Sequence, residues 1–520
     1  MKLSVLAKHI PQDLIRGVVM PETENDPEIT SVSYRSDLIK KGGLFVAIKG
    51  FKKDGHEFIN HALSNGASAV VSEVPVHGKI PALEVADSRK AMAFIADKFF
   101  DSPSEKLTII AVTGTNGKTT TTFLVQNILK KAGFNTGIVS TVDYRFGGNI
   151  FENPMTTPES LDLQKILAQM LSSGVTHVVL EVSSHAVDLY RIAGCRMDMG
   201  IFTNLSQDHL DFHGDMETYW KAKRKLFTEY LFNDQKKDQD KKAAAAVINC
   251  NDPKGQELLH LLENFSERNR LFSIGYRNGH TVKHKNTQFD VRGVKGTIST
   301  PLGDIDFTSG LAGKYNLENI MCAAGAGIAM QISLDAIKTG IESFPGVPGR
   351  MERIENASGK FVFVDYAHTP DALENVLNTL KSITCGKLIC IFGCGGDRDR
   401  TKRPEMGKIA VHLADLTVIT SDNPRSEDPM SIISDILTGI EGKAVTEYKK
   451  EECSKGLVEK GYTIDPDRRS AIQLGIQLAE SGDTVLIAGK GHETYQILPT
   501  KTIHFDDREE AKKVLEASDA

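Results

Sequence analysis

The stretch AVTGTNGKTT, residues 111–120, stands between an apolar run and a helical pattern, and it decides the fold of the middle of the chain. The apolar run LTIIAV (107–112) predicts a β-strand, and TTTTFLVQNILKK (119–131) predicts a helix. A strand, a glycine loop and a helix in this order form a phosphate-binding loop, because the N–H groups and the dipole at a helix N-terminus favour an anion. The loop is shorter than the Walker pattern G-x-x-x-x-G-K-[ST], since Val112 occupies the place of its first glycine.

The side chains of this loop suit a nucleotide. Lys118 offers a positive charge to the β and γ phosphates, and the Thr119 hydroxyl is placed to bind Mg²⁺. The alternative is a glycine turn with a solvated lysine, but the strand before the loop and the helix after it favour the nucleotide site. We expect the nucleotide to contact the whole loop: Gly114, Thr115, Asn116, Gly117, Lys118, Thr119 and Thr120.

Two further strand ends carry candidate metal ligands. EVSSH (181–185) and TNLSQDHLDFHGD (203–215) both follow apparent strands, and their carboxylates and imidazoles can hold divalent cations beside a nucleotide. We expect one or two of these five residues to bind metal and the rest to cap helices or join hydrogen-bond networks: Glu181, Asp208, His209, Asp211 and His213.

Length and pattern together predict an α/β protein of three domains. A chain of 520 residues with 40% hydrophobic residues exceeds what one core organises. Strand-like and helix-like segments alternate, which predicts parallel sheets with crossover helices. We expect an amino-terminal α/β domain over 1–104, a central phosphate-loop parallel sheet over 105–345 and a carboxyl-terminal Rossmann-like domain over 346–520, with a linker at PGVPGR (345–350).

Polar or glycine residues follow four apolar runs in the last third of the chain. These are KFVFVDYAHTP (360–370), KLICIFGCGGDRD (387–399), LADLTVITSDNP (413–424) and DTVLIAGKGHETY (483–495). Open α/β sheets bind ligands at the carboxyl ends of their strands, so we expect ligand contacts at these four ends. Cys390 and Cys394 lie in one of the runs, where an apolar strand favours buried thiols over metal ligands.

Composition argues against several classes of protein. The formal charge of −6 speaks against nucleic-acid binding through a basic surface, and no uncharged apolar run reaches the roughly 18 residues of a membrane span. The opening MKLSVLAKHIPQDL breaks its apolar character at Lys8 and lacks a cleavage site, so we expect a cytoplasmic protein, and we expect a monomer.

The seven cysteines contain no C-x-x-C pair and do not suggest a disulfide framework. The charged segment 233–242 predicts a solvated surface loop.

Eight motifs occur in an order that resembles one known family. They are GTNGKTT, EVSSH, TNLSQDHLDFHGD, GLAGKYNLEN, DYAHTP, GCGGDRD, DNPR and GKGHE. This order is similar to that of the Mur ligases, the ATP-dependent amino-acid ligases of peptidoglycan synthesis, and the resemblance runs from Ser33 to Glu493. The shortened phosphate loop is that family's own form. The likeness is strongest to members that add the third amino acid to UDP-N-acetylmuramoyl-L-alanyl-D-glutamate, which the resemblance therefore implies as a substrate.

The resemblance also implies a mechanism. ATP phosphorylates the γ-carboxylate of D-glutamate, and an amine then attacks the acyl phosphate to form an amide. Lys118 and two Mg²⁺ would neutralise the charge on the transferring phosphoryl group. Thr119 and Glu181 would hold one metal, and Glu181 and His209 would reach the other. Lys223, in YWKAKRKLF, matches a lysine that the family carries as a carbamate beside the second metal, although its residue type alone indicates a solvated charge on a basic helix.

Further nucleotide contacts are implied outside the loop. Asn316 and Asn319 in KYNLEN match positions on the adenine side, and Arg350 and Asp365 match nucleotide contacts from the third domain. Catalysis would then need that domain to close over the central one, which excludes water from the acyl phosphate. From the residues alone, Asn316 is also a candidate helix N-cap.

The resemblance implies contacts to the UDP-sugar and its peptide at five residues: Ser36, Thr156, Thr157, Ser183 and Arg191. The chain departs from the family pattern at two places. The usual Asp-Ser-Arg is here Arg35-Ser36-Asp37, with the charges exchanged, and Leu189 stands where a glutamine can occur. Because the serine is kept, the resemblance still implies a uridine contact there, with rearranged neighbours.

The stretch SDNPRSEDP (421–429) bears on which amino acid is added. Asp422-Asn423-Pro424-Arg425 matches the ligases that take meso-diaminopimelate, and Arg425 can form a bidentate pair with the carboxylate at its far end. L-Lysine ends in an ammonium alone, which a buried arginine would repel. The resemblance implies further contacts to the amino acid, the last of them suited to its ammonium: Arg398, Gly489 and Glu493.

Three other functions stay open at this point. A ligase of the same family could add L-lysine or another diamine. A folylpolyglutamate synthetase shares the ATP loop and the γ-glutamyl chemistry, but it gives no reason for an amino-terminal UDP-type domain or for DNPR. A nucleotide-switched binding protein would have no ligase activity, but no N-K-x-D guanine-binding motif is visible, and carboxylates near the loop favour chemistry.

Overall fold

The computed structural model describes most of the chain: residues 1–19, 26–51, 53–76, 80–232, 244–264, 270–442, 444–453 and 459–519. The predicted surface loop 233–242 lies outside these residues. The chain forms two compact units. The first comprises Met1–Lys283, Thr300–Gly303 and Asn319–Gly340, and the second comprises His284–Ser299, Asp304–Glu318 and Ile341–Ala520. In the described ranges, no helix is long and apolar enough to cross a membrane.

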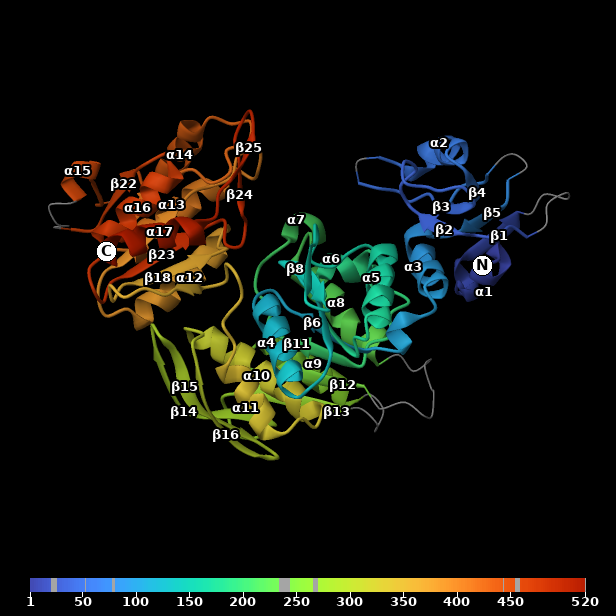
Figure 1. The fold of residues 1–520 in the computed structure, drawn as a ribbon, viewed down its shortest axis with the longest axis horizontal. Helices are drawn as coiled ribbons and strands as arrows, with labels where there is room; N and C mark the ends of the chain where they lie inside the picture. The colour runs from blue at the N-terminus through green and yellow to red at the C-terminus, as the bar shows by residue number, and fades with distance from the viewer. Residues whose placement is uncertain are drawn as a thin grey trace. The chain divides into compact units, whose positions relative to one another are not determined.

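A five-stranded sheet opens the first unit (blue in Figure 1). Its elements are α1 (Leu3–His9), η1 (Gln12–Leu14), β1 (Ile15–Val19), β2 (Ser31–Ser33), β3 (Gly43–Val46), η2 (Gly55–Phe58), α2 (Ile59–Ser64), β4 (Ala67–Ser72), β5 (Ala82–Val85), α3 (Ser88–Phe99) and η3 (Pro103–Glu105). The strand order is β1-β5-β4-β3-β2, and only β1 pairs in an antiparallel way. Leu44 and Val46 of β3 share one buried cluster with Met92 and Ile95 of α3, so α3 covers one face of this sheet.

The middle of the chain is built around β6. Its elements are β6 (Thr108–Thr113), α4 (Lys118–Lys131), β7 (Thr136–Val139), β8 (Asp143–Phe146), β9 (Asn149–Glu152), α5 (Ser160–Ser172), β10 (His177–Glu181), α6 (Ser184–Asp188), β11 (Met199–Phe202), α7 (Leu210–His213), α8 (Met216–Lys225), η4 (Leu226–Leu231), β12 (Ala245–Asn249), α9 (Pro253–Glu263), β13 (Arg270–Gly275) and β14 (Val282–Asp290). Within an eleven-stranded sheet these strands follow the order β14-β13-β12-β11-β6-β10-β7-β8-β9. Because β6 is parallel to both β10 and β11, the carboxyl ends of all three lie at one edge, as the sequence predicted.

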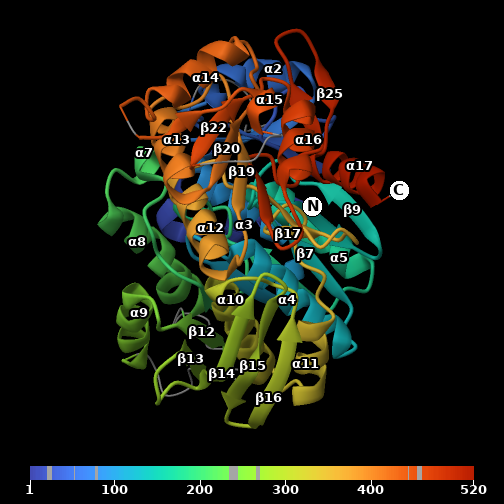
Figure 2. The same cartoon turned by 90° about the vertical axis from the view of Figure 1, so that its left-hand side faces the viewer.

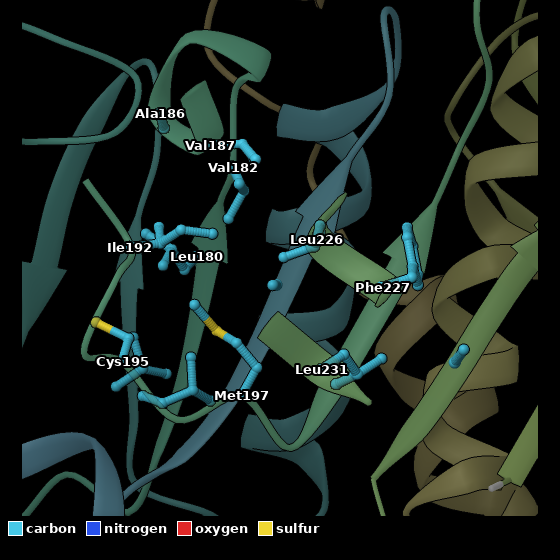
Figure 3. Packing of buried hydrophobic residues seen from close by; sticks show 14 of the residues in the cluster. Leu180, Val182, Ala186, Val187, Ile192, Cys195, Met197, Leu226, Phe227 and Leu231 are labelled. Atoms are coloured by element: carbon cyan, nitrogen blue, oxygen red, sulfur yellow. The ribbon is translucent and has the colours of Figure 1, made fainter. Parts of the chain in front are cut away.

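A large hydrophobic core supports this edge. Figure 3 shows part of it, where Leu180 of β10 lies beside Ile192; Phe227 of η4 belongs to the same buried cluster, which joins segments far apart in the sequence. Five of the six residues of β6 are buried, which is why its sequence is a continuous apolar run without alternation. The strand that precedes the phosphate loop is therefore buried on both faces of the sheet.

The predicted helix METYWKAKRKLFTEYLF is a composite of two helix types. α8 begins after Asp215, whose Oδ1 accepts a hydrogen bond from Thr218 N (2.7 Å). It ends at Lys225, and the chain continues as the π-helix η4, so the prediction of a single regular helix is wrong in its second half. Tyr219 and Lys223 are buried and lie four residues apart, so they share one face of α8.

The remaining elements include a seven-stranded sheet in the second unit. They are β15 (Gly293–Thr300), β16 (Gly303–Ser309), α10 (Lys314–Ala329), α11 (Leu334–Glu342), β17 (Glu352–Ile354), β18 (Phe361–Asp365), α12 (Pro370–Ile383), β19 (Leu388–Phe392), α13 (Lys402–Leu413), β20 (Leu416–Ile419), α14 (Pro429–Leu437), β21 (Thr446–Glu447), α15 (Lys450–Cys453), β22 (Gly461–Ile464), α16 (Arg468–Leu478), β23 (Thr484–Ala488), β24 (Tyr495–Ile497), β25 (Thr502–His504) and α17 (Asp507–Asp519). Figure 2 shows β14, β15 and β16 side by side, strands that the sequence pattern did not predict.

The order of the seven-stranded sheet is β17-β18-β23-β19-β20-β22-β21. Its neighbours β18, β23, β19 and β20 are parallel, so the four strand ends predicted to bind ligands do lie along one edge. Cys390 and Cys394 are buried, and burial raises the pKa of each thiol to about 12, which agrees with packing residues. The five-, eleven- and seven-stranded sheets each begin and end within one predicted domain range, and the domain limits themselves stay predictions.

A buried ion pair ties two of these strand ends to the helices behind them. The guanidinium of Arg468 donates to both carboxylate oxygens of Asp507, at 2.7 Å from Nε and 2.6 Å from Nη2, and neither side chain is exposed. Arg468 also donates to Ser421 O (3.3 Å) after β20 and to Ala488 O (3.0 Å) at the end of β23. The pair therefore fixes the point from which both loops leave the sheet.

Candidate functional site

Two glycines shape the loop between β6 and α4. Gly114 has a φ of +151°, and a Cβ there would lie 1.9 Å from Thr203 Oγ1. Gly117 has a φ of +80°, and a Cβ there would lie 2.2 Å from Asn319 Oδ1. Both positions therefore require glycine. The chain turns directly into the N-terminus of a 14-residue helix, whose first N–H groups lack intrahelical partners and suit a phosphate.

The segment after β11 holds this loop in place. Thr115 N donates to Asn204 O (2.9 Å), and Asn116 N donates to Asn204 Oδ1 (2.8 Å). Thr203 Oγ1 donates to Asn116 O (2.7 Å), and Tyr219 Oη lies 3.1 Å from Thr115 Oγ1. Because the protein itself uses two N–H groups of the loop, phosphate binding falls to the N–H groups at the start of α4. Sequence reasoning missed Asn204, whose signal is a polar residue directly after a buried strand.

Two lysine side chains meet at one carbonyl of the loop. Lys118 Nζ donates to Gly114 O (3.0 Å) and Thr115 O (2.8 Å), and Lys223 Nζ donates to the same Gly114 O (2.7 Å). Lys223 is 1% exposed, with Nζ 4.5 Å from the ring centroid of Tyr219. Burial lowers the pKa of Lys223 well below the usual lysine value, and repulsion from Lys118 lowers it further. The Lys223 amine is thereby shifted toward its neutral, nucleophilic form.

Glu181 ends β10 next to this loop. It is paired in register with Val112 of β6 and is fully buried. Its Oε1 accepts from Thr141 N (3.1 Å) and its Oε2 accepts from Thr141 Oγ1 (2.9 Å). Among the residues that the structure describes, no group of three or more His, Cys, Asp or Glu could hold a metal ion. A metal at this edge would therefore need other ligands beside Glu181, such as the buried hydroxyl of Thr119 and a modified Lys223.

His209 stands at the start of α7 with a left-handed backbone, at a φ of +53°. Its Nε2 lies 3.4 Å from Asp208 Oδ2. Although the His209 side chain is 41% exposed, partial desolvation lowers its pKa, the Asp208 carboxylate opposes that shift, and the charges of Lys118 and Lys223 add to it. The imidazole thus shares one electrostatic environment with both lysines of the loop, and its neutral form is the one that binds metal.

The other candidates near α7 belong to the protein's own network or to its surface. His213 is buried, with Nε2 2.8 Å from Ser184 Oγ and Nδ1 3.4 Å from Asp188 Oδ2. Asp211 is exposed. Burial and the neighbouring imidazoles lower the pKa of His185 to about 4. His213 therefore connects α7 to α6 by its side-chain contacts, which is a structural role.

Three of the residues predicted to contact substrate gather at the end of β10. Thr157 Oγ1 donates to Glu181 O (2.8 Å) and accepts from Ser183 N (3.2 Å). Arg191 Nη1 donates to Thr157 O (3.1 Å), while its Nη2 lies 3.2 Å from Glu159 Oε1. The structure thus brings Thr157, Ser183 and Arg191 into one hydrogen-bonded group beside Glu181.

Of the other two predicted substrate residues, Thr156 is connected to Glu181 through Thr141, and Ser36 lies beside α2. Thr156 Oγ1 lies 3.1 Å from Thr141 Oγ1, the hydroxyl that donates to Glu181 Oε2. Ser36 Oγ lies 3.0 Å from His61 Nδ1. Arg35 and Asp37 form an exposed bidentate ion pair, with Nη2 2.7 Å from Oδ2. The exchanged charges on either side of the serine therefore satisfy each other.

Leu189 lines a pocket of about 260 Å³ in the first unit. Lys49 and Arg89 contribute charge to the same wall, and Arg89 Nη1 also donates to Glu159 Oε2 (2.8 Å). A leucine offers no hydrogen bond where a glutamine can, so polar recognition in this pocket falls to its charged residues.

In the second unit, the ends of β20 and β23 meet at Asn423. Its Nδ2 donates to Glu493 Oε2 (2.8 Å), and Lys490 Nζ donates to Glu493 Oε2 (3.0 Å) and to Asn423 Oδ1 (3.2 Å). Gly489 has a φ of +117°, and a Cβ there would lie 2.6 Å from Asp422 Oδ2. The structure therefore clusters Asp422, Asn423, Gly489 and Glu493, and it adds Lys490, which sequence reasoning missed.

The two predicted arginine contacts come from neighbouring strand ends. Arg425 has a φ of +54°; its N donates to Ile497 O (3.0 Å) and its Nη1 donates to Gly396 O (2.9 Å). Gly396 is tightly packed, because a Cβ there would lie 1.9 Å from Pro424 O. Arg398 is exposed, and its Nη1 donates to the backbone oxygen of the preceding residue (3.1 Å). The loop after β19 and the loop after β20 therefore form one surface.

Asp365 is buried at the end of β18. Its carboxylate accepts from Met351 N (2.7 Å) and Ala367 N (2.8 Å). Burial raises the pKa of Asp365, and the charge of Arg350 acts in the opposite direction. The guanidinium of Arg350 lies 4.6 Å from the ring centroid of Tyr366. This aromatic contact orients the arginine beside the strand end.

The two asparagines of KYNLEN sit on α10. Asn316 is the third residue of that helix, so the alternative that it is an N-cap is wrong; its Nδ2 donates to Ala312 O (2.8 Å). Asn319 Oδ1 accepts from Thr121 Oγ1 of α4 (3.2 Å). Asn319 is therefore packed against the helix that begins at the phosphate loop.

Comparisons with known protein families match most of the chain. The Mur ligase family catalytic domain matches residues 28–99, the Mur ligase middle domain matches 112–327, and the Mur ligase glutamate ligase domain matches 349–491. The three matched ranges each contain all or most of one of the three larger sheets.

Individual proteins are similar over nearly the full length. A protein of Geobacter metallireducens named UDP-N-acetylmuramoyl-L-alanyl-D-glutamate–2,6-diaminopimelate ligase is 46% identical over 487 residues, 93% of each chain. A protein of the same name from Geobacter sulfurreducens is 44% identical over 522 residues, 100% of each chain. A solved structure of a ligase of that name superposes with a TM-score of 0.68 at 31% identity, and the match covers 96% of this chain and 98% of the other.

Proposed function

The chain belongs to the Mur ligase family, and from this premise we propose that it joins meso-2,6-diaminopimelate to the D-glutamate γ-carboxylate of UDP-N-acetylmuramoyl-L-alanyl-D-glutamate. It is an ATP-dependent ligase that forms a C–N bond in peptidoglycan precursor synthesis. The geometry that best supports the proposal is the buried Lys223 amine, 2.7 Å from the Gly114 carbonyl of the phosphate loop.

The phosphate loop fits a nucleoside triphosphate. Close packing at Gly114 and Gly117 keeps side chains out, and the N-terminus of α4 presents N–H groups to an anion. Lys118 would hold the β and γ phosphates and offset the charge that develops during transfer. Bound Mg²⁺ would supply further neutralisation of that charge. The residues that would hold the two ions are Thr119, Glu181, His209 and Lys223.

Lys223 fits a carbamate in particular. A neutral amine attacks the carbon of CO₂, a new N–C bond forms, and one proton leaves to solvent. The lowered pKa of Lys223 supports this step, because it provides the free lone pair. The product is an anion in place of a cation. Lys118, which shares the Gly114 carbonyl with Lys223, would then face an opposite charge where it otherwise faces a like one.

The remaining nucleotide contacts are proposed at Asn316, Asn319, Arg350 and Asp365. Arg350 already stacks on Tyr366, so little side-chain entropy is lost when it meets a phosphate or a ribose. Asp365 is held by two backbone N–H groups and can accept a hydroxyl proton without moving.

The UDP-sugar and its peptide are proposed to contact Ser36, Thr156, Thr157, Ser183 and Arg191. Thr157 and Ser183 are bonded to each other, and Thr157 is bonded to the backbone of Glu181. A carboxylate held by Arg191 would therefore lie beside the residues assigned to phosphoryl transfer. Glu159 orients Arg191 for this contact.

The amino acid is proposed to contact Arg398, Asp422, Asn423, Pro424, Arg425, Gly489 and Glu493. Arg425→Ala is expected to lower kcat/KM for meso-diaminopimelate by about 10- to 100-fold, the size of a charged hydrogen bond of ~1.5–3 kcal/mol. The rate with L-lysine should not fall, because the variant loses a repulsive charge. Coupled phosphate-release kinetics with each amino acid measure both effects.

The control for Arg425 is Arg469→Ala, which removes a guanidinium that is 60% exposed and pairs with Glu510. It should leave both rates unchanged. If Arg425→Ala leaves the preference between the two amino acids untouched, the alternative that the enzyme adds L-lysine gains support and the assignment of Arg425 fails.

The test of the function itself compares three reactions of the unmodified protein. Phosphate release is followed with ATP, Mg²⁺ and UDP-N-acetylmuramoyl-L-alanyl-D-glutamate, in the presence of meso-diaminopimelate, L-lysine or no amino acid. Release that depends on meso-diaminopimelate is the expected result. If phosphate is released with L-lysine but not with meso-diaminopimelate, the added amino acid is L-lysine. If neither amino acid causes release, the proposed substrate is wrong.

A further inference from the structure

Lys490 is a buried cation to which the proposed mechanism gives no task. It follows Gly489 directly after β23, and its side chain is 0% exposed. A lysine is almost never fully buried without partners, because the ammonium loses its hydration. The partners of Lys490 therefore indicate its role.

The Lys490 ammonium closes a ring of three hydrogen bonds. Its Nζ donates to Glu493 Oε2 (3.0 Å) and Asn423 Oδ1 (3.2 Å), and Asn423 Nδ2 donates to the same Glu493 Oε2 (2.8 Å). Asn423 Oδ1 also accepts from Ile497 N (2.9 Å). Because the amide oxygen faces two donors and the amide nitrogen faces a carboxylate, the ring fixes which way the Asn423 side chain is turned.

The same ring selects one oxygen of Glu493. Both donors of the ring bind Oε2, so Oε1 is the oxygen that an incoming ammonium can engage. The Glu493 side chain is 17% exposed, so it remains reachable from solvent. Asp422, the residue before Asn423, brings a second carboxylate to the same place, packed against Gly489. Without the Lys490 charge, the carboxylates on either side of Asn423 would have one cation fewer to offset them.

We propose that Lys490 is a positioning residue that sets which amino acid the pocket accepts. The inference rests on the proposed function, in which Glu493 meets the far ammonium of the amino acid and Arg425 meets its far carboxylate. Lys490 neutralises part of the acidic charge and turns Glu493 toward the substrate. A bare ammonium then gains little from the pocket, whereas a diamino acid with a far carboxylate also gains from Arg425. Discrimination against L-lysine therefore depends on Lys490 as well as on Arg425.

Lys490→Met tests this, because it keeps an unbranched apolar side chain and removes the charge. The KM for meso-diaminopimelate should rise about tenfold while kcat changes by less than about twofold, since the loss falls on binding. The ratio of kcat/KM for meso-diaminopimelate over L-lysine should fall about tenfold. The KM values for ATP and the UDP-substrate should not move. An unchanged KM for meso-diaminopimelate with an unchanged ratio would overturn the proposal.

Lys513→Met is the matched control. Lys513 also pairs with a glutamate three residues away, Glu510 at 2.8 Å, but it is 63% exposed and lies on α17. Its removal should alter no kinetic constant. Lys490→Arg keeps the positive charge and should restore part of the ratio, which a loss of packing alone would not do.

A double variant guards against a single variant that fails to fold. Lys490→Met with Glu493→Gln removes both charges of the ion pair together, so neither partner is left buried without the other. If Lys490 acts through Glu493, adding Lys490→Met to Glu493→Gln should change the KM for meso-diaminopimelate by less than about twofold. A further tenfold rise would contradict that route. The experiment distinguishes failure of this inference from failure of the proposed function. If the proposed function is wrong, the unmodified protein shows no phosphate release that depends on meso-diaminopimelate.

Discussion

Lys223→Ala is expected to lower kcat on the order of 10³-fold, because the variant removes a preorganised charge at the site of phosphoryl transfer. Lys223 Nζ lies 2.7 Å from the Gly114 carbonyl and is buried, so its charge acts on the phosphate loop at close range. A short carboxylic acid such as acetate should restore part of the rate, since it can fill the space that a carbamate would occupy. Phosphate release with and without acetate measures both effects.

The control for Lys223 lies two residues along the chain. Lys225 is 42% exposed and pairs with Asp188 at 3.1 Å, so Lys225→Ala should retain the rate of the unmodified enzyme. Full activity in Lys223→Ala would remove the lysine from the mechanism. A loss that acetate does not relieve would keep Lys223 but reject its carbamate.

The pH and CO₂ dependence of the enzyme follows from the same amine. Burial holds the pKa of Lys223 well below the usual lysine value, so its neutral fraction is present above that lowered pKa and is lost as the pH falls through it. Protein depleted of CO₂ should regain activity on addition of bicarbonate near neutral pH. An ordinary solvated lysine would need a pH near about 10 for the same reaction.

Lys118→Ala is expected to lower kcat/KM on the order of 10²- to 10³-fold, since a charge aimed at the transferring phosphoryl group stabilises the transition state more than the ground state. Lys118 Nζ is already held at the loop by Gly114 O (3.0 Å) and Thr115 O (2.8 Å), which limits the rearrangement needed to reach a phosphate. Binding of the UDP-substrate alone, measured by calorimetry, should not change.

Lys131→Ala is the matched control for Lys118. Lys131 lies on the same helix but in its last turn, far along the sequence from the loop, and its side chain is exposed. The control should keep its activity and thermal stability. If both variants lose activity equally, the effect comes from α4 as a helix, and the phosphate role of Lys118 fails.

Local chemistry explains why much of the fold could be predicted. β6 lies between two parallel neighbours, so its apolar run is continuous, and the glycine loop and α4 follow in the predicted order. The four strand ends of the last third are predictable for the same reason, since buried parallel strands and the polar residues after them leave a plain pattern. The apolar runs, the glycine loop and the polar strand ends can each be recognised from residues adjacent in the sequence.

Other elements leave no such pattern. β14 is mostly exposed beyond its first residue, so the alternation that marks a half-buried strand is absent there. The change from α8 to the π-helix η4 shifts the hydrogen-bond partner by one residue while the residues remain ordinary helix formers. Asn204 and Thr141 act through partners far away in the chain, Asn116 and Glu181, which no periodicity reveals.

The sequence by itself determined the identity of the motifs, their order and the strands that carry them, because glycine geometry, strand burial and helix termini are set by neighbouring residues. Residue type alone could not separate Lys223 from the other basic residues of KAKRK, which only the family resemblance singled out, and it gave Lys490 no role. Only the tertiary structure buries these two ammonium groups, one against a phosphate-loop carbonyl and one between Asn423 and Glu493. Burial raises the free energy of a charged group. The size of that effect depends on atoms that the fold brings together from distant parts of the chain.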